Sequence, residues 1–434
     1  METVNRREFV KAAVGAGAAL GALRAARPAN ARVPGANDRI SLGFIGVGGR
    51  GGGLVREFMT IQGVQVVAVA DVWEKRKRLA AERAKCNGHL DYRELIHNKE
   101  IDGIVIATPD HWHAPMAIAA MNAGKDVYLE KPMTRTIEEA RRVYAASVRT
   151  KRVLQVGVNG SSGDQWRKGR KALEDGMIGK LVLSQGSVHR NWDGKQQPRG
   201  EWNWRIDPAA GPTGTGDNYV DWKMWLGAAP KRPWDADRFF RFRKYWDYNG
   251  GIATDLFYHS LAPLNLMWNN GQGEFPRRVA GTGGIWVFKD EREVPDTFML
   301  VADYPSGHSV VLSSSMANAT STPGVIRGYE GTIDLAPRQG KGSAIVVTPE
   351  KHAAEAFVKK YGMAEVRLEL EPRPSHYQNF IDCMRTREQP VLPGLPAYKT
   401  MVAIAMSVES YRSGKVLYFD ETKQKAVDKP VKRL

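Results

Sequence analysis

The chain has 434 residues, of which 42% are hydrophobic and 25% are charged. This composition predicts a globular protein with room for two domains and excludes collagen-like, coiled-coil and disordered classes. The net charge of +16 is dispersed, with no basic stripe and no nucleic-acid motif, so we expect a solvated basic surface and no nucleic-acid partner.

The first 31 residues have the features of an export signal. Residues 5–11 carry adjacent arginines followed by an aromatic residue and a lysine, which resembles the twin-arginine signal. The apolar run at 10–23 is too short to span a bilayer comfortably, and Ala29-Asn30-Ala31 supplies a cleavage site. We expect a periplasmic or otherwise exported protein with no stable membrane anchor after cleavage; a basic amphipathic arm is the alternative.

Residues 41–58 are typical of a strand, a glycine turn and a helix. Gly46, Gly48 and Gly51 have GxGxxG spacing, which permits the tight bend, the approach of a pyrophosphate and the packing of helix on strand. The phosphates would lie at the helix N-terminus, with Gly49 and Arg50 beside them. The turn therefore predicts dinucleotide binding.

A second apolar run at 64–70 ends in Asp71, twenty residues after Gly51. A carboxylate at this distance would accept hydrogen bonds from the adenosine ribose. Its negative charge opposes a 2′-phosphate, so NAD is favoured over NADP as the cofactor. A simple turn residue at the strand end is the alternative for Asp71.

Strand and helix patterns alternate up to residue 158, which predicts a doubly wound parallel sheet in an NAD-binding Rossmann domain at 38–158. The remainder, 159–434, is predicted to be an α+β substrate domain with a mostly antiparallel sheet, whose open face sister subunits could cover in a homo-oligomer. The later expected strands lie at 101–108, 125–129, 152–158, 181–189, 281–288, 296–304 and 309–314, and the later expected helices at 74–85, 112–122, 136–149, 165–175, 376–384 and 397–412.

The segment TPDHWHAPMAIAAMNAGKDVYLEKPM at 108–133 resembles the signature of the Gfo/Idh/MocA family of nicotinamide-dependent sugar and inositol oxidoreductases. That signature contains a TP-N/D-xxH element followed by an E-K-P tripeptide. With the glycine turn, Asp71 and a later D-x-x-x-H element, the resemblance extends over essentially all of the chain after residue 31. It implies a Rossmann domain followed by a mostly antiparallel domain that carries the substrate.

Lys131 of the E-K-P tripeptide lies at the carboxyl end of a predicted parallel strand, where such sheets place their ligands. A lysine there could exchange a proton with a sugar hydroxyl, and the resemblance implies a catalytic lysine at this position. The following proline favours a cis bond. Glu130 is expected to support the turn and to contact the cofactor ribose. A surface lysine in a turn is the alternative for Lys131.

Asp255 and His259 share one face of a predicted helix, because they are four residues apart. His259 is expected to titrate near neutral pH and could accept the substrate proton as hydride leaves the same carbon, while Asp255 orients the substrate or holds the imidazole. The resemblance implies that both act with Lys131. A core histidine is the alternative, and a zinc site lacks a convincing third ligand.

Further candidates are expected at the borders of the site. By resemblance, the nicotinamide half of the cofactor is bordered by Thr108, Pro109, Asp110 and His113. Asp110 alternatively caps the next helix. Asn159 and Tyr258 could reach the substrate, with loop capping and core packing as their respective alternatives.

Neither the cysteines nor the HxH pair at 111–113 indicates a metal site. Cys86 and Cys383 are far apart in sequence and have no zinc spacing, so two buried thiols are favoured over a disulfide. The irregular stretch 190–249 holds seven tryptophans, of which one or two could stack on a sugar ring while the others pack the loop. These are Trp192, Trp202, Trp204, Trp222, Trp225, Trp234 and Trp246.

The sequence therefore predicts an NAD-dependent oxidoreductase that acts on a hydroxyl of a sugar, polyol or glycoside. The alternative is an NAD-dependent glycosidase that oxidises a sugar transiently, eliminates the aglycone, adds water and reduces the product. Little free NAD is available outside the inner membrane, which favours the alternative, whereas the D-x-x-x-H element is of the dehydrogenase type. A binding protein without turnover is a third hypothesis. The identity of the sugar does not follow from the sequence.

Overall fold

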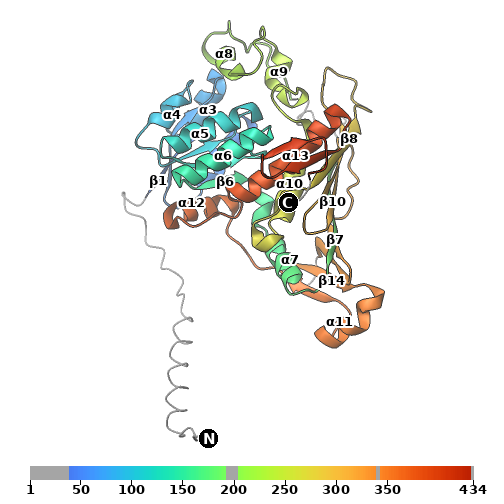
Figure 1. The fold of residues 1–434 in the computed structure, drawn as a ribbon. Helices are drawn as coiled ribbons and strands as arrows, with labels where there is room; N and C mark the ends of the chain where they lie inside the picture. Colours follow the sequence, from blue (N-terminus) through green and yellow to red (C-terminus); the bar gives the residue numbers. More distant parts are fainter. Residues whose placement is uncertain (1–38, 192–203, 339–342, 432–434) are drawn as a thin grey trace, which may run out of the picture. The chain divides into compact units, whose positions relative to one another are not determined.

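The computed structural model describes residues 39–191, 204–338 and 343–431. The predicted export signal at 1–31 lies outside this part of the chain, and so do Trp192 and Trp202. The described residues form two β-sheets, one parallel and one larger and mixed (Figure 1). Within these ranges, no helix combines the length and the apolar character that crossing a membrane requires.

The first sheet has six strands in the order β3-β2-β1-β4-β5-β6, and all of its neighbouring strands are parallel. With helices in the connections, this is the doubly wound Rossmann arrangement, so the predicted architecture is confirmed. The order reverses between β1 and β4, which is where such sheets bind ligands. The elements are β1 (Ile40–Ile45), α2 (Gly49–Met59), β2 (Val64–Ala70), α3 (Glu74–Ala84), β3 (Asn87–His89), α4 (Arg93–His97), β4 (Gly103–Ile106), α5 (His113–Asn122), β5 (Asp126–Glu130), α6 (Ile137–Thr150) and β6 (Leu154–Gly157).

Local sequence explains how this sheet positions its carboxyl edge. Strands β4 and β5 are buried along their whole length, as expected for parallel strands covered on both faces. Helix α6 begins with a capping box, in which Thr136 and Glu139 satisfy each other's backbone amides. Because β5 ends at Glu130, Lys131 follows directly at the carboxyl edge, and the Lys131–Pro132 peptide is cis.

The second sheet has eleven strands, ordered β15-β14-β13-β12-β7-β10-β9-β8-β16-β17, with β11 paired to β7. Its neighbours are antiparallel except for β7 and β10, which confirms a mostly antiparallel sheet. Helices α10 and α13 contact each other and the strands of this sheet (Figure 1). The elements are α7 (Asp164–Glu174), β7 (Leu181–Asn191), α8 (Trp222–Leu226), α9 (Ala236–Phe240), α10 (Gly251–Asn265), β8 (Arg278–Gly284), β9 (Thr297–Asp303), β10 (Ser309–Ser315), β11 (Ala317–Asn318), β12 (Val325–Gly328), β13 (Gly331–Arg338), β14 (Ala344–Pro349), α11 (Ala354–Tyr361), β15 (Val366–Glu369), α12 (His376–Thr386), α13 (Gly394–Ser413), β16 (Leu417–Asp420) and β17 (Lys425–Val427).

The strand predicted at 281–288 differs from the observed β8, which ends at Gly284. The backbone amides of Val287 and Phe288 donate to Oδ2 of Asp296 at 2.8 and 3.0 Å. This part of the chain therefore binds a side chain instead of pairing with a neighbouring strand. The sequence also predicts none of the strands after β10, because these runs are short and many mix charged with apolar residues.

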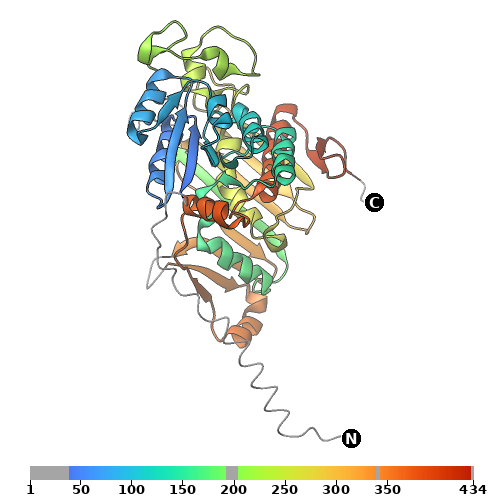
Figure 2. The same cartoon turned by 90° about the vertical axis from the view of Figure 1, so that its left-hand side faces the viewer.

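Helix α12 completes the core of the Rossmann domain, although the sequence assigns it to the substrate domain at 159–434. The ring of Phe58 in α2 lies 5.3 Å from that of Tyr377 and 6.2 Å from that of Phe380, between centroids. Figure 2 shows this orange-red helix beside the blue strands. Chain from the C-terminal region thus stabilises the nucleotide-binding half.

Both cysteines are free thiols. Cys383 in α12 is buried and Cys86 is half-buried. Burial raises the pKa of each thiol to about 11, so neither is a thiolate at neutral pH.

Candidate active site

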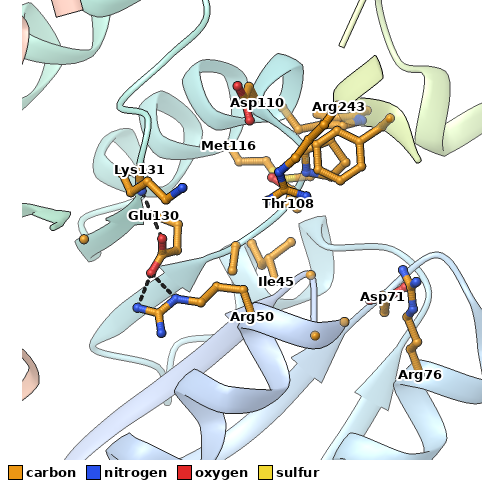
Figure 3. A pocket seen from close by; sticks show the side chains of 18 of the residues that line it. Ile45, Arg50, Asp71, Arg76, Thr108, Asp110, Met116, Glu130, Lys131 and Arg243 are labelled. Carbon is orange, nitrogen blue, oxygen red and sulfur yellow. Dashed lines mark hydrogen bonds and ion pairs between the residues drawn. The ribbon is translucent and has the colours of Figure 1, made fainter. Parts of the chain in front are cut away.

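A cavity of about 590 Å³ lies where the carboxyl edge of the parallel sheet meets α10 and residues 204–243. Its volume is in the usual range for small-molecule sites. Figure 3 shows Asp71 and Arg76 together at one side of the cavity, with Lys131 and Glu130 at the other. The cavity therefore occupies the crevice in which Rossmann folds bind nucleotides.

The turn after β1 has the backbone that a pyrophosphate requires. Gly46 has a positive φ of 78°, and a Cβ on Gly51 would lie 1.8 Å from the Gly46 carbonyl oxygen. Only glycine therefore allows α2 to begin this close to the strand. No atom lies within 4 Å of a Cβ built on Gly49, and the first turn of α2 has no acidic residue and no side-chain cap. These features fit a nucleotide whose phosphates accept hydrogen bonds from the free backbone amides at the helix N-terminus.

Asp71 follows β2 and lines the cavity together with Arg76. Its carboxylate accepts hydrogen bonds from the amides of Val47 at 2.9 Å and Trp73 at 3.0 Å, and its other lone pairs are available to ribose hydroxyls. Burial raises the pKa of Asp71, and the positive charge of Arg76 opposes that shift. Sequence reasoning missed Arg76, because one more basic residue in a charged helix carries no distinguishing signal.

Replacing Asp71 by alanine is expected to weaken NAD binding about tenfold and to reduce the preference for NAD over NADP. The ribose loses hydrogen-bond acceptors, and a 2′-phosphate loses a repulsive charge while Arg76 remains close. Calorimetric titration with both nucleotides measures the change, with Asp175→Ala, at an exposed helix end, as the control. An unchanged Kd for NAD would refute the ribose contact.

Arg50 and Glu130 join the glycine turn to the end of β5. Arg50 Nε lies 2.6 Å from Oε1 of Glu130 (Figure 3). Its Nη2 lies 3.4 Å from Oδ1 of Asn159. Asn159 also accepts from the Tyr128 hydroxyl at 3.1 Å and donates to the hydroxyl of Tyr377 in α12. Arg50, Glu130 and Asn159 all line the cavity. Arg50 and Glu130, which were predicted to bind the cofactor, thus form one hydrogen-bonded group with Asn159, which was predicted to reach the substrate.

The structure brings together Lys131, which follows β5 of the parallel sheet, and Asp255, which lies in α10 against the mixed sheet. Lys131 Nζ donates to Oδ1 of Asp255 at 2.9 Å and to its carbonyl oxygen at 2.8 Å. Arg243 Nε donates to the same Oδ1 at 3.1 Å. Burial alone would raise the pKa of Asp255, but the charges of Lys131 and then Arg243 outweigh it and hold that pKa well below its ordinary value. Asp255 is therefore an ionised anchor for the Lys131 ammonium.

His259 lies one helical turn after Asp255 and also lines the cavity. Burial lowers its pKa to about 3, and the positive charge of Lys131 acts in the same direction. The expectation that His259 titrates near neutral pH is therefore wrong for the folded chain. At neutral pH the imidazole is uncharged, so it can accept a hydrogen bond from a hydroxyl but is a weak base.

The turn after β4 contributes Thr108, Pro109 and Asp110 to the cavity wall. Asn249 Nδ2 donates to Oδ2 of Asp110 at 2.6 Å, and no side-chain cap is present at the start of α5. Burial raises the pKa of Asp110 to about 8. Asp110 is thus a largely protonated wall residue at neutral pH and not a helix cap.

His113 does not line the cavity, in contrast to the expectation that it borders the cofactor. Its Nδ1 lies 2.7 Å from the carbonyl oxygen of Pro132, and its Nε2 lies 3.0 Å from that of Thr108. The ring is buried, and burial lowers its pKa to about 4. His113 therefore connects the turns after β4 and β5 from behind the wall, which makes it a positioning residue for Lys131.

Replacing His113 by alanine is expected to lower kcat about tenfold, with a smaller effect on KM, because the turn that carries Lys131 loses its support. The unpaired carbonyls should also cost about 1–3 kcal/mol of stability. Steady-state kinetics and thermal unfolding measure both effects, with the exposed His97→Ala as the control. A lower Tm with wild-type kcat would show a purely structural role.

Tyr258 and Gly51 lie outside the cavity wall. The Tyr258 hydroxyl is buried and donates to the carbonyl oxygen of Ala397 in α13 at 2.5 Å. Successive residues of an α-helix point about 100° apart, so Tyr258 faces the core when its neighbour His259 faces the cavity. The predicted substrate contact of Tyr258 is therefore replaced by core packing, and Gly51 supports the turn through its close approach to Gly46.

Residues 204–242 form an aromatic wall beside the cavity. We use "aromatic wall" for Trp204, Trp222, Trp225, Phe239, Phe240 and Phe242, which cluster with Trp73 of the Rossmann domain. The Trp73 Nε1 donates to the carbonyl oxygen of Asp217, and the amide of Asp221 donates to that of Val72, both at 2.8 Å. Trp204 and Trp225 line the cavity. The other described tryptophans of the stretch pack elsewhere: Trp222 stacks on Trp225, Trp234 packs against Trp222, and Trp246 lies near Tyr411.

Several lining residues could not have been found from the sequence. Arg190 and Arg243 line the cavity from β7 and from the segment before α10. The only signal for Arg243 is its place among alternating basic and aromatic residues in a long irregular stretch. Within the described ranges, no group of three or more histidine, cysteine or acidic side chains is arranged to hold a metal ion. Nε2 of His111 instead faces the carbonyl oxygen of Trp225 at 2.9 Å.

The chain matches named relatives over part of their length. A "Glycosyl hydrolase family 109 protein" of Shewanella sp. (strain W3-18-1) is 30% identical over 232 residues, which are 47% of this chain and 50% of the relative. A protein of the same name from Shewanella baltica (strain OS155) is 31% identical over 232 residues, with the same coverage. The match therefore spans half the length of these relatives.

Solved structures share the fold over most of the chain. The WlbA dehydrogenase from Chromobacterium violaceum, in complex with NADH and UDP-GlcNAcA, has a TM-score of 0.64 and 17% identity, covering 90% of this chain and 99% of that one. A levoglucosan dehydrogenase, in complex with NADH and levoglucosan, has a TM-score of 0.61 and 20% identity, covering 91% and 100%.

Two family models together match more than half of the chain. The NAD-binding Rossmann fold of the oxidoreductase family matches residues 40–158, and the C-terminal alpha/beta domain of that family matches residues 163–333. These ranges agree with the parallel sheet and with much of the mixed sheet described above. The chain therefore belongs to the Gfo/Idh/MocA family of oxidoreductases, with an NAD-binding Rossmann fold at its nucleotide-binding half.

Proposed function

We propose that the protein is an NAD-dependent oxidoreductase that acts on a hydroxyl of a sugar, polyol or glycoside. The observation that carries this proposal is the meeting of Lys131, Asp255 and His259 in one cavity with the glycine turn and Asp71. The names of the sugar dehydrogenases that share the fold support a carbohydrate substrate.

Lys131 is proposed to exchange the proton of the reacting hydroxyl. When bound, NAD supplies a hydride acceptor for the carbon that bears this hydroxyl. Asp255 holds Lys131 Nζ at the carboxyl edge through two hydrogen bonds, which fixes the position of the amine before the substrate arrives. The neutral imidazole of His259 accepts a hydrogen bond from a hydroxyl and orients it toward Lys131. Because its pKa is so low, His259 is proposed to orient the hydroxyl. Lys131 is proposed to take the hydroxyl proton as the neutral amine, after its ammonium has released a proton to solvent, and to return a proton in the reverse direction.

The test is a turnover assay on purified protein with a panel of free sugars and polyols. Growth of absorbance at the reduced-nicotinamide band, only when both NAD and a substrate are present, is the expected result. A protein that binds sugars tightly without any redox change and without hydrolysis would refute the enzyme assignment and support a binding protein.

Glycoside hydrolysis is the second candidate, and the names of the partial-length relatives favour it. In this cycle the same residues would move protons while the sugar is oxidised, loses its aglycone, adds water and is reduced again. The cofactor then returns to its starting state. Release of free sugar from a glycoside without added NAD, with no net NADH, would support this candidate against a net dehydrogenase.

We also propose that the protein is exported by the twin-arginine route and acts in the periplasm. The support is the motif at residues 5–11, which lies outside the described residues. The route carries folded proteins, so the nucleotide can be bound before export. Replacement of both Arg6 and Arg7 by lysine should retain the protein in the cytoplasm, measured by cell fractionation; unchanged export would contradict the proposal.

Homo-oligomer formation through the mixed sheet is proposed from its exposed apolar residues. Met299, Val301 and Val311 of β9 and β10 are 41%, 43% and 37% exposed, whereas the residues between them face the core. Val301 lies directly opposite Val311 across the strands. Light scattering on the purified protein tests this, and a monomer at micromolar concentration would contradict it.

A further inference from the structure

A second cavity adjoins the nucleotide cavity at the glycine turn. Its volume is about 590 Å³, and it shares Gly49, Arg76 and Trp204 with the first cavity. Most of its remaining wall comes from the start of α3 and from residues 205–208 of the irregular stretch. Gly49 begins α2, so the helix end at which the cofactor phosphates are expected borders both cavities.

The arginine of the glycine turn is already paired within the protein. Arg50, which the sequence predicts beside the phosphates, donates to Glu130 at 2.6 Å, and Figure 3 shows its side chain directed toward that residue. Glu130 is buried, so its carboxylate is costly to leave without this cation. The charge of Arg50 is therefore balanced by Glu130, and the two negative charges of a pyrophosphate are left for other groups.

Arg76 of α3 lies against the same turn. Its Cζ and Nη1 are each 3.4 Å from the position of a Cβ built on Gly48. Its Cζ lies 4.8 Å from the centre of the Trp73 ring and 5.4 Å from that of Phe239, so aromatic faces hold the guanidinium in place. The charge of Asp71 opposes the lowering of the Arg76 pKa by burial. In the described ranges, however, this guanidinium donates no hydrogen bond and forms no ion pair.

Arg205 lines the second cavity from the irregular stretch. Its neighbour Asp207 pairs with Lys75 of α3 at 2.9 Å, which fixes this part of the stretch against the start of the helix. Arg205 itself has no hydrogen-bond or ion-pair partner among the described residues. Asp207 is the one acid among the described residues that line this cavity, and Lys75 balances it. Arg76 and Arg205 therefore give the wall of the second cavity a positive charge.

We propose that Arg76 and Arg205 bind the pyrophosphate of the cofactor, which is then held between two guanidiniums and the backbone amides of the glycine turn. This inference rests on NAD binding at the turn and does not depend on which substrate is oxidised. A guanidinium presents a planar fork of donors that matches phosphate oxygens. Because Arg205 belongs to the irregular stretch, the bound nucleotide also joins this stretch to the Rossmann domain.

The test is a calorimetric titration of the purified protein, freed of nucleotide, with adenosine, AMP, ADP and NAD. These ligands share the adenosine and differ in their phosphates. Arg76→Gln and Arg205→Gln are each expected to raise the Kd for ADP and for NAD about tenfold, while the Kd for adenosine stays within about twofold. The wild-type affinity for ADP should fall as ionic strength rises, and it should fall less in each variant.

Three further variants or readouts separate a phosphate contact from an effect on folding. Arg205→Lys keeps the charge and should lose less affinity for ADP than Arg205→Gln. Arg205 is exposed, so its replacement should leave Tm unchanged. Arg76 packs on aromatic rings, so the ratio of the ADP affinity to the adenosine affinity is the readout for its variant. Arg141→Gln, whose side chain pairs with Glu138 on the surface of α6, is the matched control and should keep the wild-type ratio.

The outcomes distinguish this inference from the proposed function. An unchanged ratio in Arg76→Gln and Arg205→Gln, or a change in Arg76→Gln alone, overturns the inference and leaves the proposed oxidoreductase intact. Adenosine 2′,5′-bisphosphate tests the 2′-phosphate of NADP as the other source of a phosphate here. A larger loss of affinity for this ligand than for ADP would assign the arginines to the 2′-phosphate and overturn the inference. The expected shifts in a protein that turns over no sugar would support the inference although the proposed function fails.

Discussion

Replacing Lys131 by alanine should lower kcat about a thousandfold while the Kd for NAD stays within about twofold of the wild-type value. The Lys131 ammonium faces the cavity and donates to Asp255. The phosphates and the adenosine are expected at the glycine turn and at Asp71, on the other side of the cavity (Figure 3). Loss of the amine therefore removes proton exchange and leaves the nucleotide contacts in place.

The measurements are single-turnover kinetics with saturating NAD and a calorimetric titration of NAD. Lys131→Met keeps most of the side-chain volume and should be as inactive as the alanine variant. Lys171→Ala, at an exposed position in α7, is the control and should be fully active. Retention of more than about a tenth of the wild-type kcat in both Lys131 variants would remove this residue from the mechanism.

Asp255→Ala is expected to destabilise the protein by about 3–5 kcal/mol, because it leaves the charges of Lys131 and Arg243 without the buried carboxylate that both contact. Asp255 is only 2% exposed, so solvent cannot replace it easily. The variant should also lose most turnover, since Lys131 Nζ loses the acceptor that holds it. A fall of about 5 °C in Tm is expected for a chain of this size.

The pH dependence of the stability difference between wild type and Asp255→Ala provides a second readout. The pKa of Asp255 is held below its ordinary value in the folded chain. A lowered pKa contributes stability that is fully present above the unfolded pKa, near about 4, and that is lost as the pH falls toward the folded pKa. The Tm difference between wild type and Asp255→Ala should therefore be constant from pH 6 to 8, as an approximate window, and should shrink below about pH 4.

Two further variants of acidic residues make the comparison specific. Asp255→Asn preserves the shape but removes the charge, and should be destabilised nearly as much as the alanine variant. Asp175→Ala removes an exposed carboxylate that pairs with Lys171, and should change Tm little. A wild-type Tm for Asp255→Asn at pH 7 would show that the charge pair contributes no stability.

The residues that act through the backbone are predictable from the sequence. Gly46, Gly48 and Gly51 specify the turn because their spacing reflects a local steric requirement, which the 1.8 Å approach of a Cβ on Gly51 to Gly46 makes explicit. Asp71 and Lys131 were predictable for a related reason. Each follows an apolar strand, and the carboxyl ends of parallel strands meet at one edge.

Orientation around a helix was only partly predictable. Asp255 and His259 face the cavity together because they are four residues apart. Tyr258 and His113 also stood near the site in sequence, yet both side chains are buried away from it, in contact with Ala397 and with the turns after β4 and β5. A pattern that is apolar on all sides, as in α10, does not distinguish the face toward the cavity from the face toward the core.

The sequence by itself determined the nucleotide turn, the parallel sheet and the lysine at its edge, because these depend on local spacing and on hydrophobic periodicity. Only the tertiary structure decided that Arg243, Arg190 and Arg76 share the cavity, and that α12 completes the Rossmann core. It also decided the ionisation of the site, since the pKa values of Asp110 and His259 depend on burial and on charges far away in the sequence. Such contacts between distant segments leave no periodic trace in the chain.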